Sequence, residues 1–509
     1  MSHHRICALD PSDRSSGLLL HPTSLPTPYG IGDLGPQARR LVGYLARTDT
    51  TLWQTLPLGP TGFGDSPYQS FSSHAGNLNL LSPDDLAVDG LLEPDELADL
   101  RLPGGAVDFA AVRTSRARWI PELWRRFERG AAPHLRGPFE HFVATQRRWL
   151  DDYALFMALK EHHDGAPWAQ WPEPLRDRHP AAVADARTVH AERIAVERFA
   201  QYLFCRQLLA LRRTARASGI RLVGDVPFYV AWDSVDVWTR PDLFRLREDG
   251  TPAVVAGVPP DYFSPTGQLW GNPIYDWEAH ADDGYRWWAD RLAAAFAMAD
   301  IVRIDHFRAF ADYWEIPADA PTAETGRWVD GPGLGFFEAV VDRLGPLPVI
   351  AEDLGELSPA VPRLLDATGF PGMRVLQFAF DSDDTNPFLP HTYPPRCVAY
   401  TGTHDNDTTL GWWRSASEAE RADARRILGV DDADPVAAFL DAVWSSRAMF
   451  ALAPAQDLLR LGSEARMNIP GTVGGRNWRW RMTADQLDEH LLDEVARLNA
   501  AHRRGNQVS

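Results

Sequence analysis

The sequence predicts an α/β fold, a (β/α)8 TIM barrel enlarged by inserted segments, and three observations support this prediction. The chain has 509 residues, of which 45% are hydrophobic and 24% charged, as expected of a globular protein with a large core. Short apolar runs alternate with helix-like stretches, which is typical of parallel strands buried on both faces. Several runs end in polar residues, and barrel enzymes carry their catalytic residues at the C-terminal ends of the strands.

The candidate strands are spread over the whole chain. In order, they are Gly17–His21, Leu52–Pro57, Ile220–Asp225, Ile301–Asp305, Pro348–Glu352, Met373–Phe378 and Val398–Thr403, with a weaker eighth candidate near Arg466–Gly471. Eight strands are the number that closes a barrel of this class.

The uneven spacing of these strands predicts two insertions into one catalytic barrel that spans 1–509. Residues 74–215 are expected to form a mostly helical insertion subdomain, because segments such as Thr114–Phe127 and Ala191–Ala215 are helix-like. Residues 232–275 are rich in Pro, Gly, Asp and aromatic residues, which indicates an ordered loop. No separate C-terminal β domain is expected. The alternative is two or three independent domains, as the length alone would allow.

The number of lysines and the net charge exclude several classes of protein. The chain has 51 basic and 69 acidic residues, and Lys160 is its only lysine. P-loop proteins, protein kinases and pyridoxal-phosphate enzymes each need a lysine in a motif that does not surround Lys160. A net charge of −18 argues against nucleic acid as a partner.

The sequence also argues against a membrane or exported protein. No apolar run reaches eighteen residues, and no signal peptide is visible. The three cysteines are far apart and form no C-x-x-C motif, which predicts a cytoplasmic location and no zinc site. The oligomeric state is not predicted.

The segment Ile301–Arg308 (IVRIDHFR) is the most informative candidate site. Because strand side chains alternate, Arg303 and Asp305 share one face. Two charges inside a barrel are expected to pair, and the guanidinium is expected to lower the pKa of Asp305 and keep it ionised as a nucleophile. The alternative is an ion pair that only stabilises the strand.

Two further strand ends carry polar groups. In PVIAEDLG, either Glu352 or Asp353 should face the barrel mouth, and a carboxyl group near an anionic Asp305 would have the raised pKa of a general acid. GTHDND places His404 and Asp405 after another strand. Helix caps and Asx-turns are the alternatives. A metal site made of Asp305, Glu352, His404 and Asp405 is also possible, but no short ligand spacing supports it.

Aromatic residues outside the strands indicate the class of ligand. Flat rings with polar rims suit sugars, which combine apolar C–H faces with hydroxyl groups, and three or four of these rings are expected to face a ligand. The candidates are Phe63, Tyr68, Phe71, Tyr229, Trp232, Tyr262, Phe263, Trp270, Tyr275, Trp412 and Trp413.

Together, RIDHFR, AEDLG and GTHDN resemble the three acid-bearing motifs of the α-amylase superfamily. Longer segments resemble one branch, the amylomaltases or disproportionating enzymes, which are the 4-α-glucanotransferases of glycoside hydrolase family 77. These segments are LLLHPTSLPTPYGIGDLG, WQTLPLGPTGFGDSPYQSFSSHAGN, GDVPFYVAWDSVDVW, GVPPDYFSPTGQLWGNPIY, GFPGMRVLQFAFD and EARMNIPGT. The resemblance runs from about Gly17 to Met482.

The resemblance implies that Asp305 is the nucleophile, Glu352 the general acid/base and Asp405 the transition-state stabiliser. It implies neither a metal nor another cofactor, and it makes the segment 232–275 a lid over the active-site cleft. The implied substrate-binding residues are Ser66, Tyr68, Asp225, Tyr262, Phe263, Trp270, Arg303, His404 and Asn468.

The implied reaction is the transfer of α-1,4-glucan segments between maltooligosaccharides or linear glucans by a retaining double displacement. Retaining enzymes of this kind place two carboxyl groups about 5–5.5 Å apart and form a covalent glycosyl-enzyme. An α-amylase-like hydrolase of the same superfamily is the nearest alternative. A non-catalytic glucan-binding barrel is the alternative from another class of protein.

Overall fold

The computed structural model describes residues 6–260 and 265–505. Its main sheet has eight parallel strands, which stand next to one another in chain order. They are β1 (Ser15–Leu19), β2 (Leu52–Gln54), β3 (Arg221–Val226), β6 (Ile301–Ile304), β9 (Val349–Ala351), β10 (Gly372–Val375), β11 (Cys397–Tyr400) and β12 (Phe450–Pro454).

The sheet curves round into a barrel, which confirms the predicted fold class. β12 pairs with β1, and the ring closes between β9 and β10, where the Ala351 N–H donates to the Pro371 carbonyl at 2.9 Å. Gly17 lets the strands approach, because a Cβ at this position would lie 2.8 Å from Leu452 and 2.9 Å from Leu52. The apolar core includes the barrel interior as well as the layer between strands and helices.

Seven of the predicted strands overlap observed strands, and the eighth prediction was wrong. Arg466–Gly471 follows the short helix η11 (Ser463–Ala465) and forms a loop, whereas the eighth strand is β12. β12 has the sequence FALAP, which lacks β-branched residues and follows a helix, so its sequence does not favour a strand.

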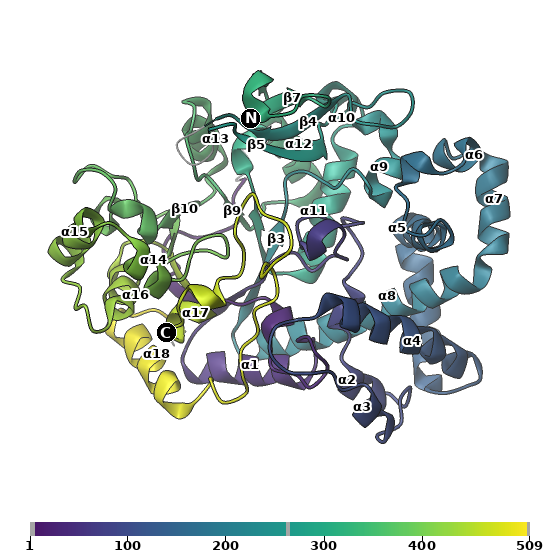
Figure 1. Ribbon diagram of the computed structural model, residues 1–509, viewed down its shortest axis with the longest axis horizontal. Coiled ribbons are helices and arrows are strands. Elements are labelled where there is room, and N and C mark those ends of the chain that lie inside the picture. Colours follow the sequence, from purple (N-terminus) through teal and green to yellow (C-terminus); the bar gives the residue numbers. More distant parts are fainter. Residues whose placement is uncertain (1–5, 261–264, 506–509) are drawn as a thin grey trace.

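Helices surround the barrel (Figure 1). Those that accompany the barrel strands directly are α1 (Pro36–Arg47), α8 (Ala191–Ala217), α11 (Arg286–Met298), α12 (Gly333–Leu344), α13 (Ala360–Thr368), α14 (Thr409–Ser415), α15 (Glu418–Leu428), α16 (Pro435–Ser445), α17 (Ala455–Leu458) and α18 (Glu489–Ala501). No helix among the described residues is long and apolar enough to cross a membrane.

The segment between β2 and β3 adds a helical group on one side of the barrel (Figure 1). Phe127, Phe139 and Phe199 pack together in its core, with the rings of Phe127 and Phe199 stacked at 4.4 Å. Besides α8, the helices of this group are α2 (Pro83–Val88), α3 (Glu96–Asp99), α4 (Phe109–Glu128), α5 (Arg136–His162), α6 (Glu173–Arg176) and α7 (Pro180–Val189).

The only lysine of the chain connects this helical group to the loop after β3. Lys160 lies at the end of α5 with its side chain 8% exposed, and its Nζ donates to the carbonyls of Gly165 and Ala166. The same nitrogen pairs with Asp233 at 2.6 Å. Lys160 is therefore a buried structural residue.

A second sheet contacts η7 (Phe307–Phe310), the short helix that follows β6. It contains the antiparallel strands β4 (Val254–Val258), β5 (Gln268–Pro273), β7 (Asp312–Pro317) and β8 (Arg327–Asp330), in the order β5-β4-β7-β8. The segment 232–275 is thus not a loop throughout, since it supplies β4 and β5 together with α9 (Val235–Thr239), while α10 (Trp277–Asp282) follows it. The strand pairing with β7 could not be predicted because β7 lies more than forty residues further along the chain.

Candidate active site

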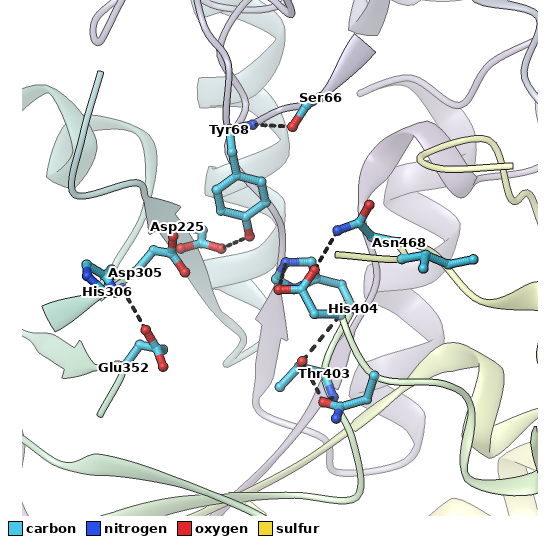
Figure 2. Close-up of polar contacts among 12 residues, drawn as sticks. Ser66, Tyr68, Asp225, Asp305, His306, Glu352, Thr403, His404 and Asn468 are labelled. Carbon is cyan, nitrogen blue, oxygen red and sulfur yellow. Dashed lines mark hydrogen bonds and ion pairs between the residues drawn. The ribbon is translucent and has the colours of Figure 1, made fainter. Parts of the chain in front are cut away.

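The candidate residues meet at the C-terminal rim of the barrel, where parallel strands bring their ends together. Asp225 lies on β3, Arg303 on β6, and Asp305 and Glu352 directly after β6 and β9. Tyr68 reaches the site from the loop after β2 and lies between the Asp305–Glu352 side and the His404–Asn468 side (Figure 2).

Arg303 joins two of the carboxylates. Its Nη2 donates to Asp305 Oδ1 at 2.8 Å, so the predicted ion pair is confirmed. Its Nη1 also donates to both oxygens of Asp225 at 2.9 Å. The Arg303 side chain is 5% exposed and that of Asp225 is fully buried, whereas Asp305 keeps 30% of its side chain exposed. A buried ion pair thus stands behind a carboxylate that a ligand can reach.

The predicted direction of the pKa shift of Asp305 was wrong. Burial raises the pKa of Asp305 above its usual value, and Asp225 and Asp405 raise it further, while the guanidinium of Arg303 opposes the change. The sequence prediction rested on the effect of the Arg303 guanidinium on the pKa of Asp305. In the structure its charge is shared with Asp225, and the carboxyl group lies in a low-dielectric setting.

Glu352 is held by two backbone N–H groups. His306 donates to its Oε2 at 2.7 Å (Figure 2), and Leu354 donates to its Oε1 at 2.9 Å. Burial, followed by the charge of Asp305, raises the pKa of Glu352 to about 7, although Arg303 and the two N–H groups act in the opposite direction. Within this pair of acids, the proton therefore resides on Glu352, which lacks the direct guanidinium contact that Asp305 has.

Of the two acids after β9, only Glu352 lies in the site. Asp353 turns to the neighbouring strand β10, where its Oδ1 accepts the Met373 N–H at 2.6 Å and its Oδ2 pairs with Arg374 at 3.1 Å.

Asp405 is oriented by the loop after β12. Asn468 Nδ2 donates to Asp405 Oδ1 at 2.7 Å, and Arg466 Nη2 donates to the Asp405 carbonyl at 2.6 Å. His404 Nε2 lies 3.4 Å from the other carboxylate oxygen. The Asp405 side chain is 43% exposed, so these hydrogen bonds hold it in place while part of it stays accessible to a ligand.

Tyr68 connects the two sides of the site. Its hydroxyl donates to Asp225 Oδ2 at 2.6 Å, and its ring stacks on that of His404 at 5.2 Å with an angle of 11° between the planes. Burial, together with the charge of Asp225, raises the pKa of Tyr68 well above its usual value, so the phenol stays a donor. Ser66 Oγ accepts the Tyr68 N–H at 3.2 Å (Figure 2).

Other aromatic candidates lie on different elements from Tyr68. Trp270 lies on β5, and its ring meets that of His306 edge-on at 4.8 Å. Tyr262 and Phe263 lie outside the described residues. Trp412 and Trp413 do not occupy a loop, because they lie on α14 and pack against the core.

His306, which follows Asp305 directly, is a site residue that was not predicted from the sequence. Its backbone is left-handed, with φ +53°, and its N–H is the group that donates to Glu352. Burial lowers the pKa of His306 to about 3, so the ring is neutral. The only sequence signal was its place within the RIDHFR motif.

Metal ligation was an open alternative for the acids and His404. In the part of the chain that the structure describes, no group of three or more His, Cys, Asp and Glu side chains is placed to hold a metal ion. The arrangement is instead that of two carboxyl groups with different proton affinities, a third carboxylate and stacked rings. Such a set suits acid–base and nucleophilic chemistry on a sugar.

Comparison with known proteins identifies a family whose sequences this chain matches. The sequence profile of glycoside hydrolase family 77, described as 4-alpha-glucanotransferase, matches residues 20–487.

Curated relatives are similar over nearly their whole length. The 4-alpha-glucanotransferase of Thermus thermophilus is 50% identical over 486 residues, which cover 94% of this chain and 96% of the relative. The 4-alpha-glucanotransferase of Streptococcus pneumoniae TIGR4 is 46% identical over 500 residues, covering 97% and 98%.

Among solved structures, the amylomaltase of Streptococcus agalactiae in complex with acarbose has a TM-score of 0.94 and 38% identity, covering 97% of this chain and all of that one. The amylomaltase of Corynebacterium glutamicum has a TM-score of 0.77 and 18% identity, covering 95% and 75%, a likeness of fold.

Proposed function

The chain belongs to glycoside hydrolase family 77 and is a 4-alpha-glucanotransferase, and we propose that it works by a retaining double displacement at Asp305, Glu352 and Asp405. The transferred groups are α-1,4-glucan segments, and maltooligosaccharides or linear glucans serve as donor and acceptor. The observation that carries the proposal is the pairing, at adjacent strand ends, of a carboxyl group whose pKa is about 7 with a carboxylate bound to a guanidinium.

In the first step, Asp305 attacks the anomeric carbon of the donor. The C–O bond to the leaving glucan breaks, and Glu352 gives its proton to the departing 4-oxygen. The pKa of about 7 supports this role, because a substantial fraction of Glu352 still carries its proton near neutral pH. The product of this step is a glycosyl ester of Asp305.

In the second step, the 4-hydroxyl of an acceptor glucan attacks the same anomeric carbon. Glu352, now a carboxylate, takes the hydroxyl proton, and the bond to Asp305 breaks, which regenerates both groups. Asp405 contributes a fixed negative charge beside the oxocarbenium-like transition state. Its hydrogen bond from Asn468 supports that role by fixing the carboxylate before substrate arrives.

The remaining site residues are proposed either to bind the donor sugar or to position the groups that do. Tyr68 and His404 would contact the glucose unit next to the scissile bond, while Arg303 and Asp225, being buried, would position Asp305 and Tyr68. Ser66, Trp270 and Asn468 are proposed to line the groove, and Tyr262 and Phe263 to belong to the lid.

Transfer requires that a sugar acceptor reach the glycosyl-enzyme before water does. We propose that the segment 232–275 acts as a lid that excludes water over the cleft. The contact between Trp270 on β5 and His306 beside Asp305 supports this role, because it ties the segment to the reacting acids.

Incubation with maltotriose tests the function. Transfer produces glucose together with a ladder of longer oligosaccharides, whereas an α-amylase-like hydrolase produces only shorter sugars, and a non-catalytic barrel leaves the substrate unchanged. A product mixture without chains longer than maltotriose would refute the proposal. The absence of a cofactor and of nucleic-acid or membrane partners, and a cytoplasmic location, remain predictions from the sequence.

The pH dependence of kcat/KM should be bell-shaped. Activity is expected to fall as the pH rises through about 7, because Glu352 then loses the proton that it must donate. It should fall at low pH through the raised pKa of Asp305, because the nucleophile becomes protonated. The two limbs describe the interacting pair rather than either residue alone.

The measurement is kcat/KM for maltotriose between about pH 4 and 9. α-Maltotriosyl fluoride provides the control, because fluoride leaves without a proton and the basic limb of glycosyl-enzyme formation should disappear. A basic limb that persists unchanged with the fluoride would show that another group causes it.

A further inference from the structure

Trp478 has an unusual backbone for a large aromatic residue at the edge of the site. Its φ is +66°, in the left-handed region that bulky side chains rarely adopt. The two glycines just before it, Gly474 and Gly475, also have positive φ, but there the missing side chain makes the conformation ordinary. Such a conformation persists only where the surroundings hold it in place.

The chain on both sides of Trp478 is held firmly. The Trp478 N–H donates to the Met467 carbonyl at 2.8 Å. The Asn477 side chain, which is 5% exposed, closes the preceding loop by accepting the Ile469 N–H and donating to the Thr472 carbonyl. On the other side, Arg479 exchanges hydrogen bonds with Val107. With the preceding chain fixed, an ordinary negative φ would swing the indole away from its present place.

The indole lies behind the two rings that face the site. Its ring centroid is 5.9 Å from that of Tyr68 and 6.1 Å from that of His404. Trp478 itself is only 7% exposed, so it does not offer a surface to the substrate. One buried ring therefore supports two residues from the loops that follow different barrel strands, β2 and β11.

Each of the two rings that Trp478 contacts is connected, through further contacts, to an acid of the reaction. Tyr68 donates to Asp225, which shares Arg303 with Asp305. His404 lies 3.4 Å from Asp405 and directly precedes it in the chain. A displacement of the indole would thus change the positions of both the nucleophile, Asp305, and the third carboxylate, Asp405.

We propose that Trp478 is a positioning residue, which sets the places of the Tyr68 and His404 rings and, through them, the geometry of the donor-sugar site. The left-handed backbone serves this role because it turns the indole toward the two rings. This inference rests on the proposed function, since Tyr68 and His404 are there the residues that contact the donor sugar.

The substitution Trp478→Gly is the most direct test, because glycine accepts the positive φ and the chain can keep its path while the ring is lost. We expect kcat/KM for maltotriose disproportionation to fall about 100-fold, the size of effect that follows from misplaced reacting groups. Trp478→Phe keeps part of the ring and should lose less. Melting temperatures are to be measured for both variants, so that an unfolded variant is recognised.

Tyr285→Gly is the matched control. Tyr285 is also an aromatic residue with positive φ (+55°), and its ring packs on Phe336 at 5.2 Å, away from the site. This variant should change the melting temperature and leave kcat/KM of the folded protein within about twofold.

A variant that already lacks the Tyr68 and His404 rings distinguishes the proposed positioning role of Trp478 from a purely structural one. In Tyr68→Ala/His404→Ala, assayed with α-maltotriosyl fluoride, adding Trp478→Gly should change the rate by less than about twofold, because the two rings through which Trp478 acts are already gone. A further loss of about 100-fold there, or an unchanged kcat/KM for Trp478→Gly alone, would overturn the inference. If the unsubstituted protein does not convert maltotriose into oligosaccharides longer than maltotriose, the proposed function itself fails. That result is independent of the Trp478 variants.

Discussion

The variant Asp305→Asn is expected to lose transfer activity by about 10⁴-fold or more while keeping its fold. The amide has nearly the shape of the carboxylate and retains an oxygen for the Arg303 guanidinium, but it is too weak a nucleophile to form the glycosyl ester. The loss should be the same with α-maltotriosyl fluoride as donor, because a better leaving group does not replace the attacking atom. Release of glucose from maltotriose and of fluoride from the activated donor measure the two rates.

Asp300→Asn is the control for this substitution, since Asp300 lies at the opposite end of the same strand. Its carboxylate pairs with Arg212 and accepts the Leu222 N–H, far from the C-terminal rim. The control should lower the melting temperature without changing kcat/KM of the folded protein. Substantial transfer by Asp305→Asn would remove the nucleophile assignment.

The variant Glu352→Gln is expected to show a different pattern. Disproportionation of maltotriose should fall about 10³- to 10⁴-fold, because the leaving oxygen is no longer protonated and the acceptor is no longer deprotonated. Glycosyl-enzyme formation from α-maltotriosyl fluoride should fall by less than about tenfold, since fluoride departs without a proton. The ester on Asp305 should therefore accumulate, and mass spectrometry of the intact protein measures it.

Added azide sharpens this test, because azide attacks without needing a base. It should release the ester as α-maltotriosyl azide and increase turnover of the fluoride by Glu352→Gln, whereas Asp305→Asn should give no such increase. Glu197→Gln, which changes a buried carboxyl group on α8, should leave both rates within about twofold. A Glu352→Gln variant with normal maltotriose turnover would contradict the acid/base assignment.

The local pattern was sufficient to predict the barrel and the places of the acids. Ile301–Asp305 is recognisable because an apolar run that carries Arg303 and ends in Asp305 allows few structures other than a buried strand with a polar end. β12 was missed because its alanine-rich sequence becomes a strand only through pairing with β1 and β11 on either side. Strand pairing of that kind is a tertiary property, and intrinsic β-propensity does not report it.

The fold class, the family and the acids at the strand ends could be predicted from the sequence, because they depend on residue types and on spacing within short segments. The way in which the acids share charge depends on contacts that form only in the folded chain. Burial raises the pKa of Asp305, and the charge of Asp225, which pairs with Arg303 from 78 residues away, raises it further, where the sequence alone indicated a lower pKa. Proton affinity depends on every charge and on the solvent around a group, and those surroundings exist only once the chain has folded.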